Sequence, residues 1–228
     1  MQRDTRSPAI TQALLLLGLL WLGDLALIVV HGAKPYFTAL RPHHFSLEAD
    51  RGIAEYFQYA KEAFIACCLM VCWYRTSIRT YFVWSLFFAF LLVDDSFSLH
   101  EQFGLVAAST VALPAWYGLR PQDVGEGLFA VFVGILTLAV IATSARNEGG
   151  RTNLRPHINI ALLLAALAVC GVLADALHVI AYFQGSRWAW ILAVIEDGGE
   201  LAVMSALAAY CVGLAVDLGG REERLLAT

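Results

Sequence analysis

Residues 86–101 read LFFAFLLVDDSFSLHE, and this stretch decides the architecture. Its first half, Leu86 to Val93, has no polar side chain, whereas residues 94–101 place three carboxylates and a histidine close together. An apolar run of this kind is typical of a membrane-spanning helix. Its charged end is either the wet tip of that helix or one wall of a polar cavity built with other helices.

The composition of the whole chain favours a membrane protein. Of its 228 residues, 59% are hydrophobic and only 15% are charged, and the mean hydropathy is +0.66. Soluble domains carry about 25% charged residues. The net charge of −4 provides no basic surface for nucleic acid, which excludes that class of partner. The five cysteines all lie in apolar runs and predict no disulfide framework.

Apolar windows recur along the chain and predict an all-α fold, a polytopic bundle of transmembrane helices with a single domain over residues 1–228. The six expected spans lie at about 9–31, 53–75, 78–100, 123–145, 157–183 and 188–216. No cleavage site follows the first apolar stretch, so we expect a retained helix there rather than a removed signal peptide.

Positive charges in the connections predict the orientation. Nine arginines lie on one side of the predicted bundle, namely Arg3, Arg6, Arg75, Arg79, Arg146, Arg151, Arg155, Arg221 and Arg224. Five basic residues lie on the other side, namely Lys34, Arg41, Arg51, Arg120 and Arg187. Because cytoplasmic loops carry the excess of Lys and Arg, both termini are expected in the cytoplasm.

The ionisable residues inside the predicted spans all lie toward the outer end. Every span contributes to the set, which consists of Asp24, Glu55, Lys61, Glu62, Asp94, Asp95, His100, Glu101, Glu126, Asp175, His178, Glu196, Asp197 and Glu200. A charge near the bilayer centre costs at least about 2.5–3.5 kcal/mol, so chance is a poor explanation for this common depth. Wet helix tips account for Glu101 and Glu126 but not for deeper residues such as Asp24 and Glu200. The pattern predicts an outward-facing polar cavity.

Helical spacing places several of these side chains on common faces. Asp175 and His178 are three residues apart, and Glu196 and Glu200 are four apart, so each pair shares one face of its helix. Residues 94–101, by contrast, cannot direct all their polar groups at one point unless the helix bends. A bend at that place is therefore a requirement for a common site.

Imidazole and carboxylate ligands on facing helices suit a divalent metal ion, zinc first and iron next. The predicted ligands are His100, His178, Asp175, Asp94, Glu196 and Glu200. Glu62 or Glu101 is then left as a general base. Two other interpretations stay open: a proton or cation path, and structural pairing of the buried carboxylates with Lys61, Arg187 or a protonated histidine.

The segment from Ser96 to His100, SFSLH, resembles the Ser-x-x-x-His element of the membrane hydrolases that include alkaline ceramidases and the adiponectin receptors. Those proteins hold zinc with histidines and an aspartate inside a seven-helix bundle, and they cleave lipid amides. The resemblance implies a catalytic role for Ser96, a metal ligand in His100 and a metal-side aspartate in Asp175. The His-x-x-x-His of their last helix is absent here, and six spans are expected rather than seven.

DDSFSLHE and EDGGE (residues 196–200) also resemble segments of uncharacterised bacterial multi-pass membrane proteins, which implies a bacterial cytoplasmic membrane but no activity. The loop charges predict that the site faces the outside of that membrane. The first functional hypothesis is an integral membrane metalloenzyme that hydrolyses a lipid or another amphiphile from the outer leaflet. The second is a proton- or cation-coupled transporter or channel, although the inner half offers no polar continuation and no inverted repeat is visible. The third is a non-catalytic subunit of a larger membrane complex. The lipid bilayer is the partner common to all three.

Overall fold

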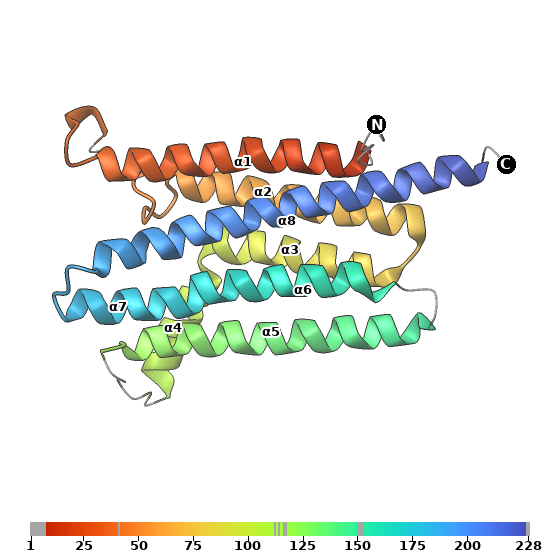
Figure 1. The fold of residues 1–228 in the computed structure, drawn as a ribbon. Helices are drawn as coiled ribbons and strands as arrows, with labels where there is room; N and C mark the ends of the chain where they lie inside the picture. The colour runs from red at the N-terminus through yellow and green to blue at the C-terminus, as the bar shows by residue number, and fades with distance from the viewer. Residues whose placement is uncertain are drawn as a thin grey trace.

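The structure is a computed structural model that describes residues 8–40, 42–111, 113, 115, 118–149 and 153–226, with the backbone alone from 221 onward. Within these residues the chain is helical and contains no strand. The long helices run side by side along one axis, and α1 begins at the same end of the bundle at which α8 finishes (Figure 1). Part of the predicted charge bias lies outside the described residues, at Arg3, Arg6, Arg41 and Arg151.

The long helices are α1 (Pro8–Ala33), α2 (Ile53–Thr76), α3 (Arg79–Phe97), α5 (Pro121–Asn147) and α8 (Ala189–Leu226). One more long segment consists of α6 (Leu154–Ala168), the π-helical stretch η4 (Val169–Ala174) and α7 (Asp175–Phe183). The shorter elements are η1 (Thr38–Leu40), η2 (His43–Phe45) and α4 (Leu99–Thr110).

The predicted helical segments match these helices to within a few residues except at three places. The segment expected at 78–100 ends at Phe97, because Ser98 adopts the left-handed conformation (φ 48°, ψ 48°), which an α-helix cannot continue. The chain then forms α4, in a stretch that was predicted to be a connection. The last helix continues to Leu226, past its expected end at 216.

In the described part of the chain, 5 helical segments are long and apolar enough to cross a membrane. They are Pro8–Ala33, Arg79–Phe97, Pro121–Asn147, Leu154–Phe183 and Ala189–Gly220. α2 is not among them, because polar residues such as Gln58, Lys61 and Glu62 lower its mean hydropathy. By length and composition, the chain is a helical membrane protein.

α2, α3 and α8 form the interior of the bundle, and α1 and α5 lie on its outside. The fully buried side chains of the interior include Ile65, Leu69, Trp84, Phe88 and Leu207. In contrast, only 6% of the apolar stretch of α1 is buried, and the same holds for α5. Their exposed side chains, such as Leu19 and Ile135, are apolar. Helices with so much exposed apolar surface are suited to contact with lipid.

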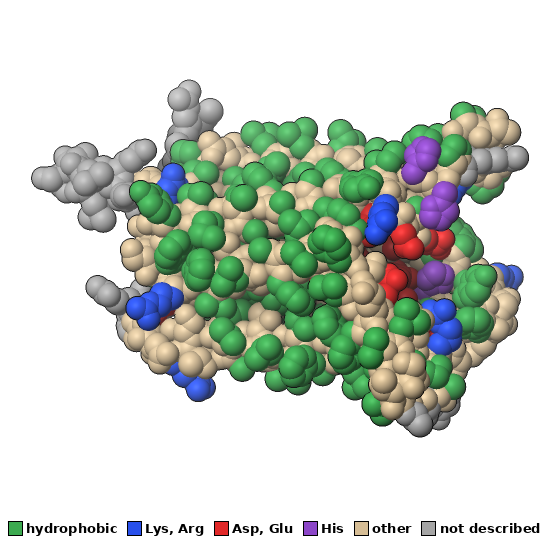
Figure 2. Space-filling model, turned by 180° about the vertical axis from the view of Figure 1, so that it is seen from behind, with side chains coloured by type: hydrophobic (Ala, Val, Ile, Leu, Met, Phe, Trp, Pro, Cys, Tyr) green, Lys and Arg blue, Asp and Glu red, His purple; other side chains and the backbone are tan. Residues whose placement is uncertain are grey.

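The acidic residues of the interior, unlike the buried Thr80 and His157, gather at the end of the bundle opposite the start of α1. Figure 2 shows the main group of Asp and Glu side chains in a recess at this end, beside histidines, while hydrophobic side chains cover the middle of the molecule. We call this the acidic end. It is built from the ends of α1 and α3, the beginnings of α2, α4, α5 and α8, and α7 (Figure 1).

Candidate metal centre

The bend at Ser98 gathers the polar groups of the segment from Asp94 to His100. The N–H of Ser98 donates to the carbonyl of Asp95 at 3.3 Å, which closes α3. Asp94 Oδ1 then accepts a hydrogen bond from the backbone N–H of His100 at 2.9 Å. This N–H is one of the free donors at the start of α4, so the carboxylate stabilises the new helix. The bend that a common site requires is therefore present.

The side chains of Asp94, Asp95 and His100 converge beside this bend, and we call them the first group. One ligand atom of each lies within 4.8 Å of the others. His100 Nδ1 is 3.3 Å from Asp94 Oδ2, and this hydrogen bond raises the pKa of His100, which lies outside the candidate spans, to about 9. A metal ion that bound His100 would have to displace a proton from it.

α2 adds a buried carboxylate to the first group. Glu62 is only 1% exposed, and its carboxyl contacts that of Asp95. Among the described residues, none donates a hydrogen bond to Glu62 Oε2 or to Oε1 of Gln58, one turn earlier. Tyr59 donates to the Asp95 carbonyl at 3.0 Å and so fixes α2 against the end of α3. A buried oxygen without a donor is costly, and a bound cation removes that cost.

The helices α7 and α8 form a second group from Asp175, His178 and Glu196. His178 Nδ1 lies 2.7 Å from Glu196 Oε2, and the carboxyl of Asp175 contacts that of Glu196. The predicted spacing explains why Asp175 and His178 lie close together, because both lie on one face of α7. The antiparallel packing of α7 on α8 then brings Glu196 next to them (Figure 1).

Glu200 lies near both groups. It interacts electrostatically with Asp95 and His100 of the first group and with Asp175 of the second. Its carboxylate lies directly against Gly171 of η4, where an added Cβ would collide with Glu200 Oε1. The glycine therefore leaves the space that the Glu200 side chain occupies.

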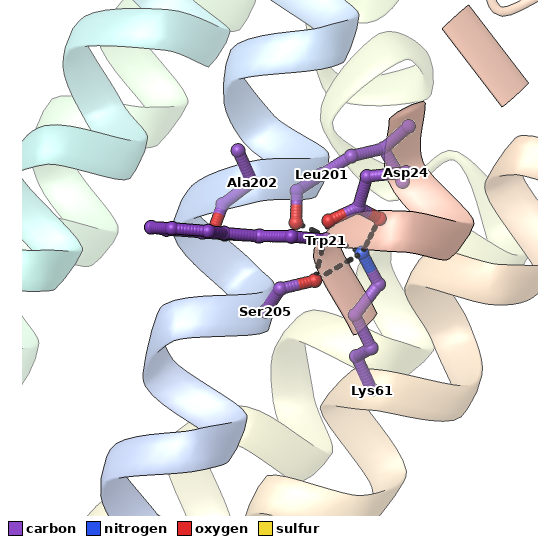
Figure 3. A network of polar contacts seen from close by, with 6 residues as sticks. All are labelled: Trp21, Asp24, Lys61, Leu201, Ala202 and Ser205. Atoms are coloured by element: carbon purple, nitrogen blue, oxygen red, sulfur yellow. Dashed lines mark hydrogen bonds and ion pairs between the residues drawn. The ribbon is translucent and has the colours of Figure 1, made fainter. Parts of the chain in front are cut away.

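The buried lysine pairs with Asp24 and leaves the α8 glutamates without it (Figure 3). Lys61 Nζ is 2.8 Å from Asp24 Oδ1 and donates to the Leu201 carbonyl at 2.9 Å. Ser205 Oγ accepts from Lys61 at 3.2 Å and lies 2.6 Å from Asp24 Oδ2, to which it donates. Lys61 and Asp24 are each 3% exposed. This network joins α1, α2 and α8 and satisfies both charges.

The predicted ligands thus lie in two groups rather than in one set. Asp94 and His100 belong to the first group, and Asp175, His178 and Glu196 form the second, whereas Glu200 interacts electrostatically with both. The sequence predicts that Asp95 lies in the polar cavity, but Asp95 is not among the predicted ligands. Its place in the first group depends on the bend, for which the sequence contains no glycine or proline as a signal.

The three predicted catalytic residues have different surroundings. Glu62 touches the first group, as described above. Glu101, in the first turn of α4, interacts electrostatically with His100. Ser96 is partly buried just before the bend and makes none of the hydrogen bonds that join the first group in the described structure.

A family model described as a domain of unknown function, DUF8692, matches residues 9–214. The chain belongs to the DUF8692 family. The matched region contains both groups of side chains and the Lys61–Asp24 pair, so all of them lie within the family domain. No curated protein and no solved structure matches the chain.

Carboxylates outnumber basic groups at the acidic end of this DUF8692 domain. Lys61 is bound to Asp24, and Arg120 is bound to Asp123 at 2.7 Å. The bases that lie within the two groups are the two histidines. The surplus negative charge has to be balanced by protons or by bound cations.

Two surface grooves of the DUF8692 domain lie at the opposite end, beside the α2–α3 turn. Their volumes are about 770 and 1030 Å³, and both include Ser77, Arg79 and Ser144. Neither touches the two groups of carboxylates and histidines. His157, by contrast, is buried at the start of α6, away from the acidic end. We assign the chemistry to the acidic end, because it holds the histidine–carboxylate contacts, the converging carboxylates and the buried carboxyl oxygen of Glu62 without a donor among the described residues.

Proposed function

We propose that this protein is an integral membrane metalloprotein with six spans, both termini in the cytoplasm and the acidic end outside. α2 is the sixth span. It packs against α3 and α8, and its Lys61 pairs with Asp24 of α1, so Lys61 and Glu62 are buried in protein rather than in lipid. An even number of spans fits the position of the start of α1 and the end of α8 at one end of the bundle (Figure 1). The arginine bias assigns that end to the cytoplasm.

The acidic end binds a divalent metal ion, zinc first and iron next. The observation that carries this proposal is the convergence of Asp94, Asp95 and His100 beside Glu62, whose buried Oε2 receives no hydrogen bond within the described structure. Two aspartates and one imidazole are ligands that both metals accept. The surplus of carboxylates over bases at this end favours a cation for the same reason.

The activity we propose is hydrolysis of a lipid or another amphiphile from the outer leaflet. Asp94, Asp95 and His100 would hold the metal ion, which would supply an activated water and polarise a scissile carbonyl. Glu62 touches the first group and is shielded from solvent, so in its deprotonated form it is placed to accept a proton as general base. The recess at the acidic end borders the apolar outer surface of the bundle, which suits a substrate that is itself partly in the bilayer (Figure 2).

An ion path across the membrane has less support from the structure. The interior beyond the acidic end is filled mainly by apolar side chains, among them Ile65, Leu69, Trp84 and Phe88, each fully buried. The buried polar side chains there, such as Ser85 and His157, do not form a continuous series with the acidic end in the described structure. A transported ion needs polar partners along its whole path. The hydrolase is therefore the function that the interior supports best.

The test is hydrolysis of amide- and ester-linked lipids by the purified protein in liposomes. Removal of metal with a chelator is expected to abolish cleavage, and added zinc or iron is expected to restore it. Asp95→Asn is expected to lower the rate at least about tenfold, whereas Asp217→Asn, at the far end of α8, leaves it unchanged. Cleavage that survives chelation, or proton or cation flux without cleavage of any such lipid, would contradict the proposal.

A further inference from the structure

One imidazole fixes the connection between α1 and α2 to the end of α1. His31, in the last turn of α1, accepts at Nδ1 a hydrogen bond from the backbone N–H of Leu47 at 3.1 Å. Ser46 Oγ lies 3.3 Å from the same nitrogen. Because a backbone N–H can only donate, this contact requires an Nδ1 without a proton. The imidazole is therefore uncharged in this arrangement and carries its proton at Nε2.

The residues that this nitrogen holds are buried, although they belong to a connection. Ser46, Leu47 and Ala49 are each less than a tenth exposed, and we call residues 46–49 the strap. Leu47 packs in one apolar cluster with Ala54 of α2 and Leu201 of α8. The strap thus covers the start of α2 and the turn of α8 that contains Leu201, at the acidic end of the bundle.

The hydrogen bonds to His31 are the polar link between the strap and α1 in the described structure. The backbone bonds around the strap are local, since Ser46 donates to His43 at 2.8 Å and Gly52 donates to Ala49 at 2.8 Å. Leu47 N–H has no second acceptor among the described residues. A buried N–H that loses its acceptor is costly, so loss of the His31 contact favours exposure of the strap.

The groups around His31 leave it able to take up a proton. The side chain is partly exposed, and Glu48 and Lys34 act on it electrostatically with opposite signs. None of the other charged or titratable groups of the neighbouring elements forms an ion pair or hydrogen bond with His31 in the described structure; they are Asp24 of α1, His43 and His44 of η2, Glu55 and Lys61 of α2, and Asp197 of α8. The state of the imidazole therefore decides whether the contact with the strap forms.

We infer that His31 is a pH-sensitive latch: the uncharged imidazole holds residues 46–49 against α1, α2 and α8, and a proton on Nδ1 releases them. Imidazole is the side chain whose charge ordinarily changes between about pH 5 and pH 8. Once protonated, Nδ1 is a donor that faces the N–H donor of Leu47, so the hydrogen bond is lost. Release uncovers Leu201, whose carbonyl binds Lys61, and opens the acidic end beside α1. The latch does not depend on the proposed metal site, since His31 is not one of its ligands.

The test is hydrogen exchange of the purified full chain in detergent at about pH 8 and about pH 5, followed by mass spectrometry. The quantity compared is the protection of the strap amides, which is their exchange rate relative to an unstructured chain at the same pH. We expect wild-type protection to fall at least about tenfold at the lower pH. His31→Leu removes the acceptor and is expected to show low protection at both pH values. His31→Asn keeps an acceptor oxygen near the position of Nδ1 and does not titrate, so it is expected to stay protected at both.

His44→Gln is the matched control, because His44 is an exposed imidazole in the same connection, and it is expected to respond to pH as the wild type does. Equal protection of the wild-type strap at both pH values would overturn the latch. So would a fall with pH in His31→Leu or His31→Asn as large as in the wild type, because another group would then cause it. A wild-type fall that extends to the buried residues 204–211 of α8 would also overturn it, since the bundle as a whole would then be unfolding.

Discussion

Lys61→Met is expected to destabilise the protein by about 3–5 kcal/mol, because it leaves the carboxylate of Asp24 buried and without a cation. Asp24 is 3% exposed, and among the described residues Ser205 is the other side chain that donates a hydrogen bond to it. The same loss of stability is expected for Asp24→Asn, which leaves the ammonium group of Lys61 buried without a carboxylate. Thermal or denaturant unfolding in detergent, followed by circular dichroism, measures the difference.

The double variant Asp24→Leu with Lys61→Met separates the charge effect from packing. Replacement of both partners by apolar residues of similar size is often neutral, so the double variant is expected to recover most of the lost stability. Lys34→Met is the matched control, since Lys34 lies in the connection after α1, and its effect is expected within about 0.5 kcal/mol. If the single and double variants lose the same stability, the charges of the pair do not stabilise the protein and only the packing of the two side chains matters.

Glu200→Gln is expected to lower metal affinity at least about tenfold while the protein stays folded in detergent, because glutamine keeps the size of the side chain and removes its charge. Glu200 interacts with both groups, and Lys61, the buried base of α2, is bound to Asp24. The carboxylate therefore has no lysine partner that would make its role structural. Titration of the purified variant with Zn²⁺ by calorimetry measures the affinity.

A structural role for Glu200 predicts the opposite outcome. If its charge only adds to the repulsion among carboxylates, the glutamine variant becomes more stable to heat and its metal content does not change. Asp217→Asn removes a carboxylate from the same helix at the other end and serves as the control for the metal content. A more stable Glu200→Gln protein with unchanged metal content would remove Glu200 from the site.

The sequence predicts the helices and the depth of the polar residues, because both depend on local composition. Apolar runs long enough to cross a bilayer locate α1, α5 and α8 to within a few residues at their starts. The high cost of isolated charge in lipid explains why the common depth of the acidic residues already indicated a cavity.

The sequence does not predict that the polar residues form two separate groups, because this separation depends on backbone conformations that no local sequence pattern marks. Ser98 adopts the left-handed conformation without being glycine, and the π-helical turn of η4 lies in an ordinary apolar run. The sequence also does not indicate which carboxylate forms the ion pair with Lys61. Asp24 and the α8 glutamates lie at similar depth, and only the packing of α1 on α8 brings Asp24 within 2.8 Å of the ammonium group.

Elemental analysis of the purified wild-type protein beside Asp94→Asn tests the central claim, that the acidic end binds a divalent metal ion. Asparagine keeps the oxygen that accepts from the His100 N–H and loses the charge that faces the imidazole. We expect about one equivalent or more of zinc, iron or manganese in the wild type and at least about a tenfold loss in the variant. Less than about a tenth of an equivalent of any of these metals in folded wild-type protein would contradict the claim.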